Sequence, residues 1–240
     1  MHIINYAHRG ASEYAPENTM SSFYLGLLQG ANGIETDVQR TKDGELVLFH
    51  DDSVDRVSDG HGKLSDFTLK ELKNLKIYGN NTCGFYDRIP TLKEFLDKFS
   101  TYDIRFAIEL KGAGVEEETL AMIKKYGIEH KTTFTSFQFA YIQKIKEIDG
   151  NARVGYLTLD TDKTHIHQLL DIGGEEIAPK AEEITEENMR YWRSNNLGVR
   201  AWGVSSVALM KKMCDLRVDG MTVNFPDRLY QYVNSASYMR

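Results

Sequence analysis

Residues 33–38 read GIETDV, a short run of β-forming residues that follows an amphipathic helical stretch at 17–29. The same alternation of short strand and amphipathic helix recurs along the chain, and it is typical of βα units around a parallel sheet. We expect strands at residues 3–8, 33–38, 104–110, 132–136, 153–158, 175–179, 198–204 and 219–224. We expect helices near 17–29, 91–99, 115–126, 138–148, 163–171, 185–195, 206–214 and 226–234. Eight such units favour an α/β fold of the closed (β/α)8 type, a TIM barrel, although an open doubly wound sheet would show the same alternation.

The alternation is interrupted after the strand at 33–38. The next residues, TKDGELVLFHD, predict a tight Asp-Gly turn into a further strand, so that His50 should arrive on a hairpin beside the strand at 33–38. Residues 51 to about 90 are rich in Asp, Gly and Asn and fit no βα unit. We therefore expect one domain over 1–240 with a small inserted lobe at about 51–90, over the end of the barrel where functional loops gather.

Composition narrows the classes of partner. The formal net charge of −6 and the pI near 5.7 offer no long-range attraction to polyanions, so we expect no nucleic-acid binding and no stable association with an anionic membrane. The two cysteines, Cys83 and Cys214, lie far apart and are expected to be free thiols. The N-terminal residues resemble no signal peptide, and no run is long enough to span a membrane, so we expect a cytoplasmic protein.

Polar residues gather where the first strands end. These groups are His8-Arg9-Gly10, Glu35-Thr36-Asp37, His50-Asp51 and Glu109-Leu110-Lys111. The active site of a parallel barrel lies at the carboxyl ends of its strands, so these residues are candidates for chemistry. A single Glu-x-Asp pair or a single His is usually structural, but four such motifs at one edge favour a functional site.

The residue types in these groups indicate phosphate chemistry. Side chains two apart on a strand share a face, so Glu35, Asp37 and Glu109 are expected to converge. Three carboxylates suit one hard divalent cation, Mg²⁺ or Ca²⁺, better than zinc. Arg9 offers a fork for phosphate oxygens and Lys111 a point charge.

The two histidines add proton transfer to this phosphate site. His8 and His50 can supply the base that activates an attacking oxygen and the acid that protonates a departing alcohol. Which of them is the acid is left open by the sequence. Trp202, between Ala201 and Gly203, is interpreted either as a residue of the barrel mouth or as a core residue.

Eight motifs give the chain a specific resemblance. They are AHRG at 7–10, APENT at 15–19, IETDV at 34–38, FHDDSVDR at 49–56, IPTLKEFL at 89–96, IELK at 108–111, SFQ at 136–138 and AWGV at 201–204. Over nearly its whole length the chain resembles the glycerophosphodiester phosphodiesterases, and the inserted stretch resembles the lobe of that family.

The resemblance implies a set of roles. It makes His8 and His50 the acid/base pair, Glu35, Asp37 and Glu109 the metal ligands, and Arg9 and Lys111 the phosphate contacts. It also places Glu17 beside the site as an orienting residue and Trp202 against the glycerol of the substrate. The implied reaction is hydrolysis of a glycerophosphodiester to sn-glycerol 3-phosphate and an alcohol, with attack of the glycerol 2-hydroxyl to give a cyclic phosphate as one route.

Two positions depart from the family pattern, and two other functions stay open. The departures are Gly203-Val204-Ser205 after the tryptophan and Asn224-Phe225-Pro226 near the last proline, and we expect them to affect pocket detail rather than reaction class. The alternatives are a lysophospholipase D or sphingomyelinase D-like phosphodiesterase and a catalytically inactive ligand-binding barrel. The polar stretch at 56–63 favours a water-soluble substrate, and the intact histidines and carboxylates favour catalysis.

Overall fold

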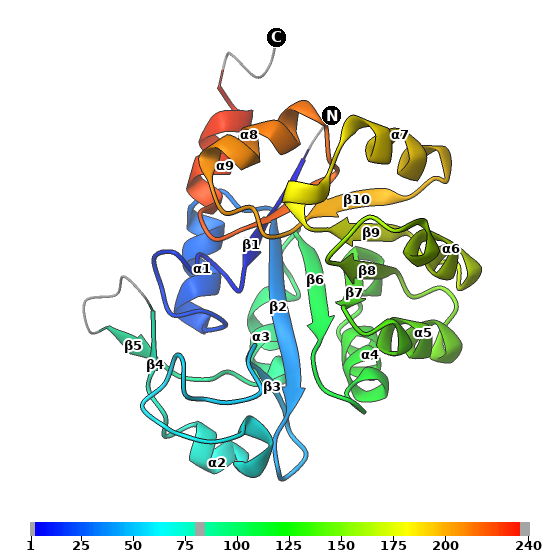
Figure 1. Cartoon of the computed structure of the whole chain (residues 1–240). Helices are drawn as coiled ribbons and strands as arrows, with labels where there is room; N and C mark the ends of the chain where they lie inside the picture. Colours follow the sequence, from blue (N-terminus) through cyan, green and yellow to red (C-terminus); the bar gives the residue numbers. More distant parts are fainter. Residues whose placement is uncertain (1–2, 80–84, 236–240) are drawn as a thin grey trace.

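A ring of parallel strands surrounded by helices forms the body of the molecule in the computed structural model, which describes residues 3–79 and 85–235 (Figure 1). The barrel strands are β1 (Ile4–His8), β2 (Gly33–Arg40), β6 (Arg105–Leu110), β7 (Thr132–Ser136), β8 (Val154–Thr158), β9 (Glu176–Pro179), β10 (Gly198–Ala201) and β11 (Gly220–Val223). They pair in the order β1-β11-β10-β9-β8-β7-β6-β2, and a β1–β2 pairing closes the ring. The predicted barrel and its eight predicted strands are confirmed.

Helices cover the outside of the barrel where the sequence predicts them. They are α1 (Met20–Leu28), α3 (Leu92–Phe99), α4 (Glu116–Lys125), α5 (Phe139–Ile148), α6 (Lys163–Asp171), α7 (Glu186–Ser194), α8 (Val207–Asp215) and α9 (Pro226–Val233), with single turns η2 (Glu129–Lys131) and η3 (Ala181–Glu183). In α3 a capping box starts the helix, because the Thr91 side chain accepts from the Glu94 N–H while the Glu94 carboxylate accepts from the Thr91 N–H. Phe95 then packs edge-on against Phe106 of β6, which fixes α3 to the barrel.

The two faces of the barrel strands differ in chemistry. Along β2 the buried residues Ile34 and Val38 belong to the apolar core that also contains the helical Phe95. Because successive side chains alternate, Glu35 and Asp37 point to the opposite face, into the barrel. The strand pairing sets Asp37 level with Glu109 of β6. Alternation and register together therefore place the acidic residues side by side inside the barrel.

The inserted lobe follows the predicted hairpin. Strand β3 (Leu46–Leu48) pairs antiparallel with β2, and His50 comes shortly after it. The lobe contains the turn η1 (Leu64–Asp66), α2 (Leu69–Leu72) and a small antiparallel sheet of β4 (Ile77–Tyr78) and β5 (Tyr86–Asp87). A separate apolar cluster, which includes Val54 and Leu72, joins the lobe to Val47 of the hairpin. The predicted lobe is confirmed for its described part, which leaves out residues 80–84.

Two further expectations concern the whole chain. Cys214 is a buried free thiol, whereas Cys83 lies outside the described residues. Within the described parts of the chain, no helix has both the length and the apolar character needed to cross a bilayer.

Candidate active site

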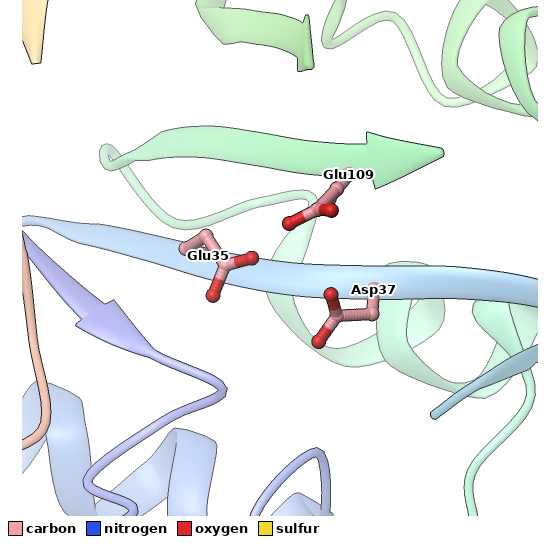
Figure 2. A group of neighbouring side chains, drawn as sticks. All are labelled: Glu35, Asp37 and Glu109. Atoms are coloured by element: carbon pink, nitrogen blue, oxygen red, sulfur yellow. The ribbon is translucent and has the colours of Figure 1, made fainter. Parts of the chain in front are cut away.

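Three carboxylates meet at the mouth of the barrel. Glu35 and Asp37 come from β2 and Glu109 comes from β6, and Figure 2 shows the three side chains turned toward one another. All three residues are buried, and one carboxylate oxygen from each lies within 4.8 Å of the others. This spacing lets three oxygens reach one ion. The predicted convergence is confirmed as a possible metal site, and the identity of the ion stays a prediction.

The electrostatics of this cluster favour a bound cation. Burial, together with repulsion from Asp37 and Glu109, raises the pKa of Glu35 well above its ordinary value. Burial and the charge of Asp37 likewise raise the pKa of Glu109 to about 7. Three buried carboxylates without a cation thus resist full ionisation, and a divalent ion would offset both burial and repulsion. The donor set, which is oxygen only, fits Mg²⁺ or Ca²⁺.

Two basic side chains flank the cluster. The Arg9 Nε lies 3.3 Å from an Asp37 oxygen, and the Lys111 Nζ lies 2.8 Å from a Glu109 oxygen. Burial disfavours the charged form of Asp37, but Arg9 above all outweighs it, so the pKa of Asp37 lies below its ordinary value. The Asn18 amide also donates to Asp37 at 2.8 Å. Arg9 and Lys111 therefore lie where the sequence predicts them, beside the carboxylates.

His8 ends β1 on one side of the cluster. Its Nδ1 lies 2.6 Å from the Asn224 Oδ1, and its Nε2 lies 3.9 Å from a Glu35 oxygen. An amide oxygen only accepts, so Nδ1 donates and Nε2 keeps a free lone pair. Burial and the charge of Arg9 lower the pKa of His8 to about 3, so the imidazole is neutral at physiological pH.

His50 has a different partner. Its Nδ1 lies 2.5 Å from the Asp51 Oδ1, and the other Asp51 oxygen accepts from the Arg56 Nε at 2.5 Å. Burial disfavours ionisation of Asp51, but hydrogen bonds from Arg56 and His50 outweigh it and lower the pKa of Asp51 to about 2. An ionised carboxylate therefore backs His50, whereas a neutral amide backs His8.

Glu17 connects the two sides of the site. Its carboxylate accepts from the Arg9 Nη1 at 2.9 Å and from Arg56 of the lobe at 2.6 and 2.9 Å. The Glu17 carboxylate thus fixes two guanidinium groups. That of Arg9 lies beside the carboxylate cluster, and that of Arg56 lies beside Asp51. This arrangement matches an orienting role for Glu17 more closely than a direct substrate contact.

A pocket of about 170 Å³ opens between the histidines and the far wall of the barrel. Trp202 and Phe137 form part of this wall, with their rings edge-to-face at 5.0 Å. The Trp202 Nε1 donates to the Thr158 carbonyl at 3.1 Å, which holds the indole in place. The structure thus places Trp202 in the wall of this pocket, and its contact with a substrate stays a prediction.

A buried ion pair closes the pocket from below. Arg200 lines the pocket, and its Nε donates to Glu176 at 2.7 Å while its Nη1 donates to Thr222 at 2.8 Å. The Arg200 guanidinium also lies over the ring of Tyr6, 5.5 Å from its centroid. Tyr6 lies two residues before His8 on β1, and His8 is level with Glu35. The layer formed by Tyr6 and Arg200 is therefore deeper in the barrel than the carboxylates.

Several of these residues were not predicted as site residues. Asp51 belongs to the candidate group His50-Asp51 but has no role of its own in the sequence-based prediction, and Asn224 enters that prediction only as a departure from the family pattern. Arg200 gave no signal, because Glu176 lies 24 positions away in the chain. Arg56 ends the FHDDSVDR motif, but its partner Glu17 lies 39 positions away. Such pairs become visible only when the fold brings the segments together.

The fold and the site together define a class: (β/α)8-barrel hydrolases in which a carboxylate cluster and two histidines share one mouth. Residues 8–228 match the glycerophosphoryl diester phosphodiesterase family. The chain belongs to this family, whose members are phosphoric diester hydrolases that act on glycerophosphodiesters.

Similar proteins from other organisms agree with this assignment. A glycerophosphodiester phosphodiesterase of Caldanaerobacter subterraneus is 33% identical over 97% of this chain and 98% of its own length. One from Bacillus altitudinis is 33% identical over 93% of this chain and 95% of its own. A solved phosphodiesterase of Oleispira antarctica, in complex with the product sn-glycerol-3-phosphate, is 26% identical, with a TM-score of 0.83 and 96% of each chain covered.

Proposed function

We propose that the protein hydrolyses glycerophosphodiesters to sn-glycerol 3-phosphate and an alcohol, with one divalent cation held by Glu35, Asp37 and Glu109. The observation that carries this proposal is that the three carboxylates and both histidines converge on one mouth. The product in the Oleispira antarctica structure is the one proposed here. A bound Mg²⁺ or Ca²⁺ would polarise a phosphoryl oxygen and offset charge that develops on it.

The asymmetry of the histidines supports a role for each. His8 is neutral, with the Nε2 lone pair free, and is therefore proposed as the base that takes a proton from the attacking hydroxyl. The His50 ring is held through Nδ1 by the Asp51 carboxylate, and His50 is proposed as the acid that gives a proton to the leaving alcohol. The attacking hydroxyl is either the glycerol 2-hydroxyl or water, and the His8 role is the same for both.

The remaining residues bind and orient. Arg9 and Lys111 lie beside the carboxylates and are proposed to hold the non-bridging phosphate oxygens. Glu17 keeps Arg9 in place, and Trp202 offers an apolar surface to the carbon atoms of glycerol. Arg56, through Asp51, is proposed to orient His50.

The test is a turnover assay with coupled detection of sn-glycerol 3-phosphate. Glycerophosphocholine, glycerophosphoethanolamine and glycerophosphoinositol are offered beside a lysophospholipid, with the protein chelated and then reloaded with Mg²⁺ or Ca²⁺. We expect release from the water-soluble diesters, loss on chelation and recovery on reloading. Preference for the lysophospholipid would support a lysophospholipase D, and full activity after exhaustive chelation would contradict the metal assignment.

A further inference from the structure

A second hollow, of about 570 Å³, lies beside the carboxylates. Residues of the β2–β3 hairpin, of the loop after β6 and of the inserted lobe line it, so we call it the lobe groove. Its charged lining residues are Arg40, Lys42, Lys63, Lys111 and one acid, Asp52. In a chain with a formal net charge of −6, this is a local excess of positive charge.

The charges of the lobe groove differ in availability. Arg40 is engaged with Glu118 at 2.8 Å, and Lys111 is engaged with Glu109 at 2.8 Å. Lys42 and Lys63 are exposed, and within the described residues neither forms an ion pair. Two ammonium groups therefore remain available to an anionic ligand, although Lys42 is also attracted to Glu71 and the carboxylate of Asp52 opposes an anion.

The lobe groove adjoins the carboxylate cluster at Lys111. Lys111 lines it, and the Lys111 Nζ also lies 5.8 Å from the centre of the Phe137 ring, which forms a wall of the smaller pocket. Lys111 thus separates the pocket assigned to glycerol from the lobe groove. Asp52 follows Asp51, the partner of His50, so the groove lies on the side of the proposed acid.

We infer that the lobe groove receives the leaving alcohol, and that the protein favours diesters whose alcohol carries a phosphate of its own. The inference rests on the proposed function, because it takes the scissile phosphate to lie at Lys111 and the metal cluster. A phosphate monoester brings close to two negative charges, which Lys42, after β2, and Lys63, in the inserted lobe, can meet in the groove that both line. An uncharged alcohol gains nothing from either ammonium group.

A matched pair of substrates tests this preference. Glycerophosphoinositol and glycerophosphoinositol 4-phosphate each release one sn-glycerol 3-phosphate, and their alcohols differ only by a phosphate. We expect the phosphorylated diester to have the higher kcat/KM, by roughly tenfold at low salt, and the advantage to shrink as salt screens the exposed lysines. Equal or lower kcat/KM for the phosphorylated diester would overturn the inference.

Charge-reversal variants test the residues. The double variant Lys42→Glu/Lys63→Glu should lose the preference for the phosphorylated diester and keep the parent's kcat/KM for glycerophosphoinositol. Lys70→Glu is the matched control, since Lys70 is an exposed lysine of the same lobe that does not line the groove. A double variant that keeps the parent's ratio, or a control that loses it, would contradict the assignment to Lys42 and Lys63.

A binding measurement separates this inference from the proposed function. In calorimetric titrations, inositol 4-phosphate should bind the parent and inositol should not. The affinity for inositol 4-phosphate should be roughly tenfold weaker in the double variant and unchanged in Lys70→Glu. A parent that hydrolyses neither diester would contradict the proposed function, and the titration would still test the groove. Equal binding of inositol 4-phosphate by parent and double variant would reject the groove.

Discussion

The two histidines differ in the group that each contacts through Nδ1. His8 faces the Asn224 amide and His50 faces the Asp51 carboxylate. The Asn224 oxygen accepts from the His8 Nδ1 and leaves the His8 Nε2 free to accept a proton, whereas the Asp51 carboxylate holds the His50 ring from the other side of the site. In the proposed mechanism, Asn224 therefore orients the base, His8, and Asp51 orients the acid, His50.

Replacing either histidine should reduce kcat far more than it changes KM, by about 10²- to 10⁴-fold, because proton transfer matters in the transition state. A substrate whose leaving group needs no protonation distinguishes the proposed acid, His50, from the proposed base, His8. With a p-nitrophenyl glycerophosphodiester, whose alcohol leaves without protonation, His50→Ala should regain most of its activity and His8→Ala should not. The measurement is kcat for each variant on both substrates, and rescue of His8→Ala instead would reverse the assignment.

Asn224→Asp should move the acidic limb of the kcat/KM profile. A carboxylate behind His8 stabilises the imidazolium and raises the pKa of His8 from about 3, so His8 becomes protonated, and unable to act as a base, at a higher pH than in the parent. We expect the acidic limb to shift upward by roughly one unit or more. A pH profile of Asn224→Asp that overlays the parent's would remove Asn224 from the control of His8.

Metal affinity should depend on pH through Glu109. The metal-free pKa of Glu109 is raised to about 7, so below that pH a proton competes with the cation for the same carboxylate. The apparent Kd for Mg²⁺ should weaken by about tenfold between pH 8 and pH 6. Titrations at several pH values measure this, with Glu109→Gln as a variant in which binding is weak throughout. A Kd independent of pH over this range would contradict Glu109 as a ligand.

At the scale of the strands, the deeper layer of the barrel depends on one ion pair. Arg200→Met leaves Glu176 buried without its partner and should lower the free energy of unfolding by about 3–5 kcal/mol. The double variant Arg200→Met/Glu176→Gln should recover much of this loss, because no uncompensated charge remains. Urea unfolding of both single variants and the double gives the coupling. Additive losses would show that Arg200 and Glu176 stabilise the barrel independently.

The elements were largely predictable and the contacts between them were not. Every barrel strand and outer helix lies where periodicity predicts it, because each buries one face against a neighbour of fixed geometry. The carboxylate cluster was predictable for the same reason, since strand alternation decides which way Glu35 and Asp37 point. The roles of Asn224 and Arg200 were not, because they depend on partners that only the closed barrel brings near.

At the scale of the whole molecule, the closed ring has a consequence for the timing of synthesis. Strand β1, which carries His8, pairs with β11, and Asn224 lies directly after β11. His8 and Asn224 are far apart in the sequence, so the ribosome makes them roughly 10 to 40 s apart at ordinary elongation rates. During that interval His8 lacks its Asn224 partner, and the nascent chain should stay inactive. Assays on stalled ribosomes should detect diester hydrolysis only after residues 220–224 have left the exit tunnel.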